Sequence, residues 1–185
     1  MKRIHFIISS FLVLILSSCT TTQYADSPEK QAQRLEQEKI NNLYIEEAKA
    51  AITNQDFVLE GDQITSKRGR SIYVSPNTNF ISLKDGRATV QIAFTGGYIG
   101  QNGIGGITVQ GIASNIQTKT TKKGNTVFSM NVTGRGISAQ IEIELLAGSN
   151  RAIGRVNPNF NSNRIILSGR LYTTENSSVF KAQSY

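Results

Sequence analysis

Cys19 is the residue whose surroundings specify the most definite chemistry. It follows Leu16-Ser17-Ser18 at the end of an apolar run, a pattern typical of the cleavage box of bacterial lipoproteins. In such a box the cysteine thiol receives a diacylglyceryl group, and cleavage makes the cysteine the first residue of the mature chain. We therefore predict that Cys19 is lipidated and that it attaches the rest of the chain to membrane lipid.

The residues before Cys19 fit the same interpretation. Lys2 and Arg3 supply a positive start, and residues 4–16 are almost wholly apolar, which is the layout of a secretory signal. This apolar run is shorter than the ~20 residues that a permanent membrane-spanning helix needs. We predict a lipoprotein signal peptide over residues 1–19.

The residues after Cys19 indicate a tether and a location. Residues 20–27 are polar and without periodicity, so we predict a tether there. Thr20 rather than an aspartate follows the cysteine, which in the sorting rule of diderm bacteria favours the outer membrane. The expected location is the cell envelope, on the outer membrane and facing the periplasm, held by two or three acyl chains.

The rarity of cysteine and histidine limits the possible chemistry. Cys19 is the only cysteine, and the only histidine is His5 in the leader. The mature chain would therefore have no imidazole and no free thiol. Their absence excludes Ser-His-Asp and Cys-His catalysis, imidazole or thiolate zinc sites, and a disulfide within the chain. We predict no cofactor, no metal and no enzymatic activity.

Two pairs of carboxylates remain as candidates for acid–base chemistry. Glu142 and Glu144 are two residues apart on a predicted strand, so both point to the same face. Such a pair could serve as acid and base of a glycoside hydrolase or bind Ca²⁺, although solvated glutamates on an outer face are commoner. Glu60 and Asp62 flank Gly61 in what we expect to be a turn, with the same alternatives.

Two loops are candidates for binding. Residues 96–106 contain six glycines. They contain no Gly-Lys-Ser/Thr motif and no helix is expected after them, so a phosphate-binding loop is not expected. Tyr98, Ile99 and Ile104 could instead line the entrance to a pocket. The asparagine-rich loop that contains Phe160 is either packed by that ring or offers a polar surface to a glycan or a partner protein, and we count Phe160 as a ligand-binding candidate.

The distribution of charge indicates anionic partners. Without Lys2 and Arg3 the chain has 18 basic and 13 acidic residues, or +5, with −2 over residues 20–53 and +7 from residue 54 onward. An anionic glycolipid or an envelope protein is a plausible partner. The basic residues, including those of residues 66–70 and Lys122-Lys123, are scattered and often serve only solubility, so no nucleic acid is expected.

The pattern after the tether changes from helix to strands. Ser27-Pro28-Glu29 is a typical helix start, and the apolar residues Ile40, Leu43, Tyr44, Ala48, Ala51 and Ile52 form one face of a helix over residues 28–54. We expect the second half of this helix to pack on the following domain.

Residues 55–185 are expected to form an antiparallel β domain. Eight to ten short alternating segments follow one another without helices, and Asp85-Gly86 is the strongest hairpin signal. A break in the alternation near Gly111-Ile112 suggests a bulge. So many strands in one domain must close or fold over to protect their edges. We predict a mainly β fold, a single antiparallel β-barrel or strongly curved lipocalin-like sheet preceded by one N-terminal α-helix, with a two-sheet β-sandwich as the alternative.

Several strings, taken together, resemble one known family. They are Phe57-Val58-Leu59-Glu60, Asn102-Gly103-Ile104-Gly105-Gly106, Gly148-Ser149-Asn150-Arg151, Asn157-Pro158-Asn159-Phe160-Asn161-Ser162-Asn163-Arg164 and Ser178-Val179-Phe180. From about Ile45 to the C-terminus, the chain resembles the Bacteroidetes lipoproteins that carry domain of unknown function 4251. The resemblance implies a lipocalin-like β domain tethered in the envelope, and it implies no activity and no functional residues.

The expected function is therefore binding rather than catalysis. We expect a membrane-anchored envelope lipoprotein whose β domain holds an apolar or amphipathic ligand or an envelope partner protein. A structural envelope component is the alternative, and a carboxylate-based glycoside hydrolase is a remote one. A hollow interior would favour the ligand, and a filled interior would favour the partner.

Overall fold

The computed structural model describes residues 27–94, 105–134, 138–159 and 164–181. The chain divides into two units, Met1–Gln37 and Glu38–Tyr185. Helix α2 (Pro28–Asn54) begins in the first unit and ends in the second. No helix of the described ranges is both long enough and apolar enough to cross a membrane.

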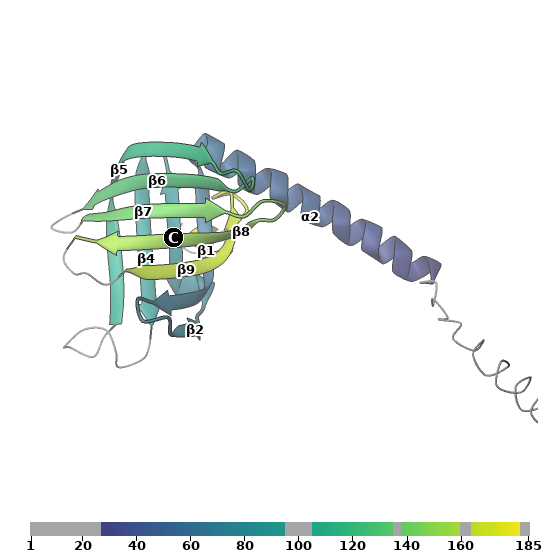
Figure 1. Ribbon diagram of the computed structural model, residues 1–185, viewed down its shortest axis with the longest axis horizontal. Helices are drawn as coiled ribbons and strands as arrows, with labels where there is room; N and C mark the ends of the chain where they lie inside the picture. The colour runs from purple at the N-terminus through teal and green to yellow at the C-terminus, as the bar shows by residue number, and fades with distance from the viewer. Residues whose placement is uncertain (1–26, 95–104, 135–137, 160–163, 182–185) are drawn as a thin grey trace, which may run out of the picture. The chain divides into compact units, whose positions relative to one another are not determined.

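The second unit is a nine-stranded antiparallel sheet (Figure 1). The strands are β1 (Phe57–Ser66), β2 (Ser71–Tyr73), β3 (Asn79–Lys84), β4 (Arg87–Phe94), β5 (Gly105–Thr120), β6 (Thr126–Gly134), β7 (Ser138–Leu145), β8 (Arg151–Pro158) and β9 (Ile165–Tyr172). A short 3₁₀ helix, η2 (Pro76–Thr78), precedes β3, and a short helix, α3 (Ser178–Lys181), follows β9.

The sheet closes on itself. The strands are ordered β1-β3-β4-β5-β6-β7-β8-β9, and β9 pairs back with β1 from Val58↔Tyr172 to Ser66↔Ile165. β2 is an additional strand that pairs with the second half of β1. The predicted barrel preceded by one helix is confirmed, and the β-sandwich alternative is wrong because β9 and β1 join what would be the two sheet edges.

The turn between β3 and β4 is the tight hairpin that Asp85-Gly86 predicted. Asp85 and Gly86 have φ angles of 49° and 71° and join β3 to β4. Positive φ at both central residues is the geometry of a type I′ hairpin, which follows the twist of the two strands. The expected hairpin at this position is confirmed.

Two predictions about irregular positions were wrong. Residues 60–62 do not form a turn: they lie within β1, where the register against β9 shifts between Gly61 and Gln63. The bulge expected near Gly111-Ile112 lies between Ser114 and Gln117 instead. In both cases one irregular position disturbs the alternation without ending the strand.

Helix α2 packs on the barrel with only its last residues. Ala48, Ala51 and Ile52 are buried among the barrel side chains. The ring of Tyr44 meets the edge of Tyr172 with centroids 6.0 Å apart, and Glu47 Oε1 accepts hydrogen bonds from the backbone N–H and the hydroxyl of Thr173 at 3.0 and 2.9 Å. Of the apolar residues expected to pack, Ile40 and Leu43 are 39% and 71% exposed. The predicted contact was therefore too long by about one turn, because the observed contact begins at Tyr44 rather than at Ile40.

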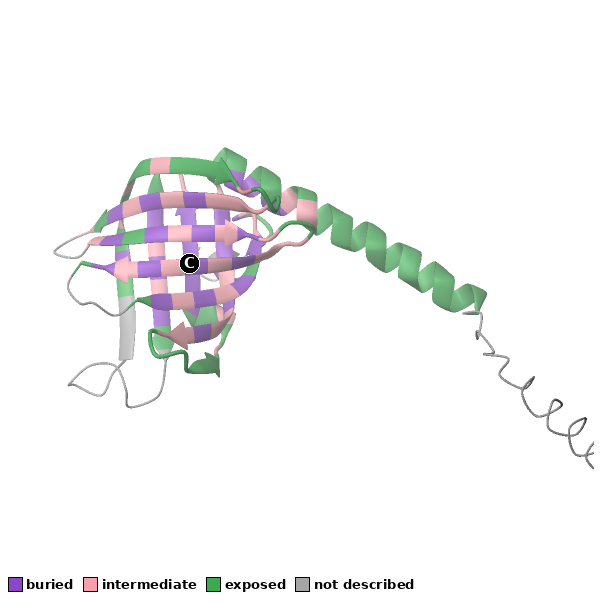
Figure 2. Ribbon diagram, in the orientation of Figure 1, coloured by how far each residue is buried: buried purple, intermediate pink, exposed green. Residues whose placement is uncertain are grey.

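Buried residues recur along the strands of the barrel (Figure 2), and their side chains pack into one core cluster. Along the strands buried residues alternate with partly exposed ones, as in the burial of β7 and β8. The buried cluster includes Phe57, Leu59, Ile81, Leu83, Val90, Phe128, Met130, Ile141, Ile143, Val156, Leu167 and Leu171. At Gly154, a Cβ would lie 2.7 Å from Ile81 Cδ1 and 2.9 Å from Leu59 Cδ2. Glycine there makes room for larger neighbours, so space inside the barrel is already taken.

The segment after β9 is ordered against the outside of the barrel. Helix α3 follows a turn after β9, and Val179 is buried against Val58 and Phe80. Glu60 Oε1 holds the start of α3 by accepting hydrogen bonds from Ser177 Oγ and from the backbone N–H of Ser178, both at 2.8 Å.

Candidate functional site

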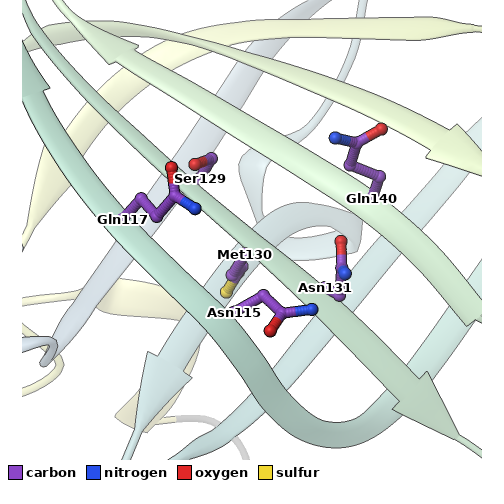
Figure 3. A pocket seen from close by; sticks show the side chains of 6 residues that line it. All are labelled: Asn115, Gln117, Ser129, Met130, Asn131 and Gln140. Atoms are coloured by element: carbon purple, nitrogen blue, oxygen red, sulfur yellow. The ribbon is translucent and has the colours of Figure 1, made fainter.

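A polar depression of about 270 Å³ lies on the outer wall of the barrel across β5, β6 and β7 (Figure 3). We call it the outer-wall depression. It is lined by Asn115 and Gln117 of β5, Ser129, Met130 and Asn131 of β6, and Gln140 of β7. The Met130 side chain belongs to the buried core of the barrel, so the five polar side chains are the groups that a molecule in the depression would meet.

The bulge in β5 creates this depression. Ser114 pairs with Asn131 and Gln117 pairs with Ser129, so two β5 residues, Asn115 and Ile116, lie opposite the single β6 residue Met130, and β5 has one extra residue. Asn115 has φ = 51°, a left-handed conformation that asparagine adopts more readily than most residues. Ile116 packs against the buried cluster, whereas Asn115 is exposed. The irregularity therefore directs an amide to the outside and opens the ladder between the two strands.

Strand pairing brings the remaining amides together. Asn131 lies opposite Gln140, and Ser129 lies opposite Glu142. Because side chains at paired positions project to the same face, the polar groups of three strands form one surface. The polar lining of this surface consists of four amides and one hydroxyl.

The five polar side chains have no internal partners. Among the residues that the structure describes, none of them forms an intramolecular hydrogen bond through its side chain; Asn131 accepts one from Ser114 Oγ through its main-chain oxygen. Each amide offers two N–H donors and one oxygen acceptor, and the serine offers both functions. These groups are therefore available to a molecule that enters the depression.

The neighbouring charged side chains neutralise one another. Arg155 of β8 forms ion pairs with Glu142 Oε1 at 3.0 Å and with Glu144 Oε2 at 2.9 Å. Asn125 Nδ2 donates a hydrogen bond to Glu144 Oε1 at 2.7 Å. The hydrogen bond from Asn125, followed by that from Arg155, lowers the pKa of the Glu144 carboxyl. A glycosidase acid needs a raised pKa, so this pair has the electrostatics of an ion-pair network.

The other predicted pair is also engaged in structural contacts. Glu60 caps α3, as described above, and Asp62 forms an ion pair with Arg151 at 2.5 Å. Glu60 and Asp62 contact different residues, so the structure does not bring the two carboxylates together as a site. Within the described ranges no group of three or more His, Cys, Asp or Glu could hold a metal ion.

Several sequence candidates lie outside the described residues. These are the lipidation residue Cys19 and the proposed ligand-binding residues Tyr98, Ile99, Ile104 and Phe160. The described ends of the asparagine-rich loop meet through a hydrogen bond from Arg164 Nε to Asn157 Oδ1 at 3.0 Å. The outer-wall depression was missed because its amides come from three strands. The only signal in the sequence was the set of amides at positions 115, 117, 131 and 140.

Comparison with known proteins identifies relatives of the barrel. The family model described as domain of unknown function (DUF4251) matches residues 39–171. A crystal structure of a DUF4251 family protein from Bacteroides eggerthii DSM 20697 is 44% identical and superposes with a TM-score of 0.72, covering 80% of this chain and 99% of that one. No curated protein matches the chain.

Proposed function

We propose that this chain, which belongs to the DUF4251 family, is a non-catalytic cell-envelope lipoprotein that binds its partner through the outer wall of its barrel. The observation that carries this proposal is the outer-wall depression, where five polar side chains from three strands have no side-chain hydrogen-bond partner among the described residues. Polar groups that converge on a concave surface can fix the orientation of a bound molecule and provide specificity.

The filled interior supports an external site. Lipocalin-like barrels that carry apolar ligands need an internal cavity, whereas here Gly154 is required so that Ile81 and Leu59 fit. A ligand inside the described part of the barrel would have to displace packed side chains, which costs free energy at every contact. We therefore place the partner outside and not within the barrel.

The non-catalytic part of the proposal is supported by the arrangement of charge. Arg155 holds both Glu142 and Glu144, and the lowered pKa of Glu144 opposes proton donation near neutral pH. The depression itself contains neutral side chains. Neutral amides form hydrogen bonds that bind and orient a molecule, but they are poor general acids and bases, because they neither release nor take up a proton near neutral pH.

Photo-crosslinking in cells tests the binding role. Replacing Gln117 with p-benzoylphenylalanine places a crosslinker at the depression, and replacing Gln110, which is exposed on the same strand outside it, is the matched control. We expect a discrete, light-dependent adduct in the envelope fraction from position 117 and little or none from position 110. Equal labelling at both positions, or none at 117, would contradict a partner at the outer wall.

Envelope anchoring requires Cys19, and Cys19→Ser tests it. We expect the variant to incorporate no labelled palmitate and to leave the membrane fraction, because an acyl chain must be attached to the thiol. The measurement is metabolic labelling combined with membrane fractionation, with Ser18→Ala as a control that keeps a small residue before the cysteine. Palmitate labelling that persists in Cys19→Ser would refute the anchor.

A further inference from the structure

We infer that the outer-wall depression is a subsite for a single sugar ring of a neutral glycan. This assignment rests on the proposed function, because it names the ligand of the same surface. The charge, the hydrogen-bonding groups and the size of the depression support it.

The depression offers no unpaired charge to a ligand. Its polar lining consists of Asn115, Gln117, Ser129, Asn131 and Gln140. The nearest charged positions in the register are Glu142, opposite Ser129 and already paired with Arg155, and Lys119, two residues after Gln117 on the same face of β5. Neither of them lines the depression. Phosphate, carboxylate and ammonium groups are normally recognised by charge-assisted hydrogen bonds. Because its lining carries no charge, the site favours a neutral ligand.

The hydrogen-bonding groups match hydroxyls. A sugar hydroxyl donates one hydrogen bond and accepts others, so its best partners are groups that can do both. Four amides and one hydroxyl lie around the depression, and each of them can donate and accept. Figure 3 shows that they come from both sides of the central strand β6, so a ring lying over β6 could be contacted from several directions.

The size and the lining fit one ring better than a larger ligand. The volume of about 270 Å³ lies just under the range of roughly 300–1,000 Å³ that is typical of pockets for drug-sized molecules. A peptide, in contrast, is usually held by apolar anchors or by pairing with a strand edge, and this lining contains no aromatic side chain.

Titration calorimetry on the full lipidated chain tests the assignment. The chain is kept in a zwitterionic detergent, because a sugar-based detergent would compete. The probes are neutral oligosaccharides of glucose, mannose, galactose and N-acetylglucosamine, with oligogalacturonate as the acidic comparison. We expect at least one neutral oligosaccharide to bind, and the double variant Asn131→Ala/Gln140→Ala to weaken its binding by about tenfold or more.

The control separates the depression from the rest of the surface. Gln110→Ala removes an exposed amide from the same strand and should leave the affinity unchanged, and the melting temperatures of all variants should stay close to that of the wild type. The inference is overturned if no neutral oligosaccharide binds, if oligogalacturonate binds more tightly, or if Gln110→Ala weakens binding as much as the double variant.

The calorimetric outcome is distinct from the outcome for the proposed function. A specific crosslink from position 117 in cells, combined with no binding of any neutral oligosaccharide, would overturn the glycan assignment and leave an outer-wall partner in place. Absence of both would overturn both proposals.

Discussion

Gly169→Ala is expected to destabilise the protein by about 3 kcal/mol or more, because the new methyl group has no space. Gly169 lies on β9 directly opposite Gly61 of β1. A Cβ at this position would overlap the carbonyl oxygen of Glu60 and would lie 2.8 Å from the Cα of Gly61. Both neighbours belong to the backbone of β1, so rotation of a side chain cannot relieve the clash.

The position of the clash adds to its effect. Gly169 lies in the ladder between β1 and β9 that closes the barrel, so separating the strands there exposes two sheet edges. Exposed edges offer unpaired backbone groups to other chains, and we expect the variant to aggregate as well as to unfold at lower denaturant concentration. The measurement is urea unfolding of the full chain followed by circular dichroism.

Gly148→Ala provides the comparison. Gly148 has φ = 70° in a surface turn, and nothing lies within 4 Å of the position of its Cβ. The substitution should cost only the strain of a left-handed residue, about 1 kcal/mol. If Gly169→Ala were no more destabilising than Gly148→Ala, β1 and β9 would not approach as closely as the closed barrel requires.

Local patterns predicted the elements of the fold but not the closure. The alternation of Ala88, Val90 and Ile92 and the dipeptide Asp85-Gly86 identified β4 and its hairpin, because both signals lie within a few residues. The pairing of Val58 with Tyr172 joins residues more than one hundred positions apart, and no local pattern encodes it. The barrel was nevertheless favoured over an open sheet because so many strands must protect their edges.

The filled interior could not be predicted for a related reason. Leu167 occupies the space over Gly61, and Ile81 and Leu59 occupy the space over Gly154. Which glycine meets which large side chain depends on the register between strands. The sequence shows only that glycines and leucines are present.

The candidate site depended on one irregular position. Apolar Ile112 stands at a position where the alternation calls for a polar residue, and this predicted a bulge there. In the structure Ile112 is simply an exposed apolar residue, 67% accessible, and the register between β5 and β6 shifts after Ser114. Moving the bulge by three residues changes which side chains of β5 face outward. The convergence of Asn115 with Asn131 and Gln140 therefore became visible only with the register known.

Phe128→Ala is expected to cost about 3–5 kcal/mol of unfolding free energy, the range for removal of a buried phenylalanine. The Phe128 ring is fully buried and meets the Phe57 ring edge-on, with centroids 5.2 Å apart. Val127→Ala is the matched control on the same strand. Val127 is only partly buried, and its truncation should cost about 1 kcal/mol or less.

The same variant tests whether the barrel is filled, and so whether an external site is needed. If packed side chains occupy the interior, benzene should raise the melting temperature of Phe128→Ala, because it replaces the deleted ring in a dry apolar cavity. The wild type should show no such rise. Equal stabilisation of both proteins would mean that the native barrel already contains an apolar cavity, and a ligand inside the barrel would then compete with a partner at the outer wall.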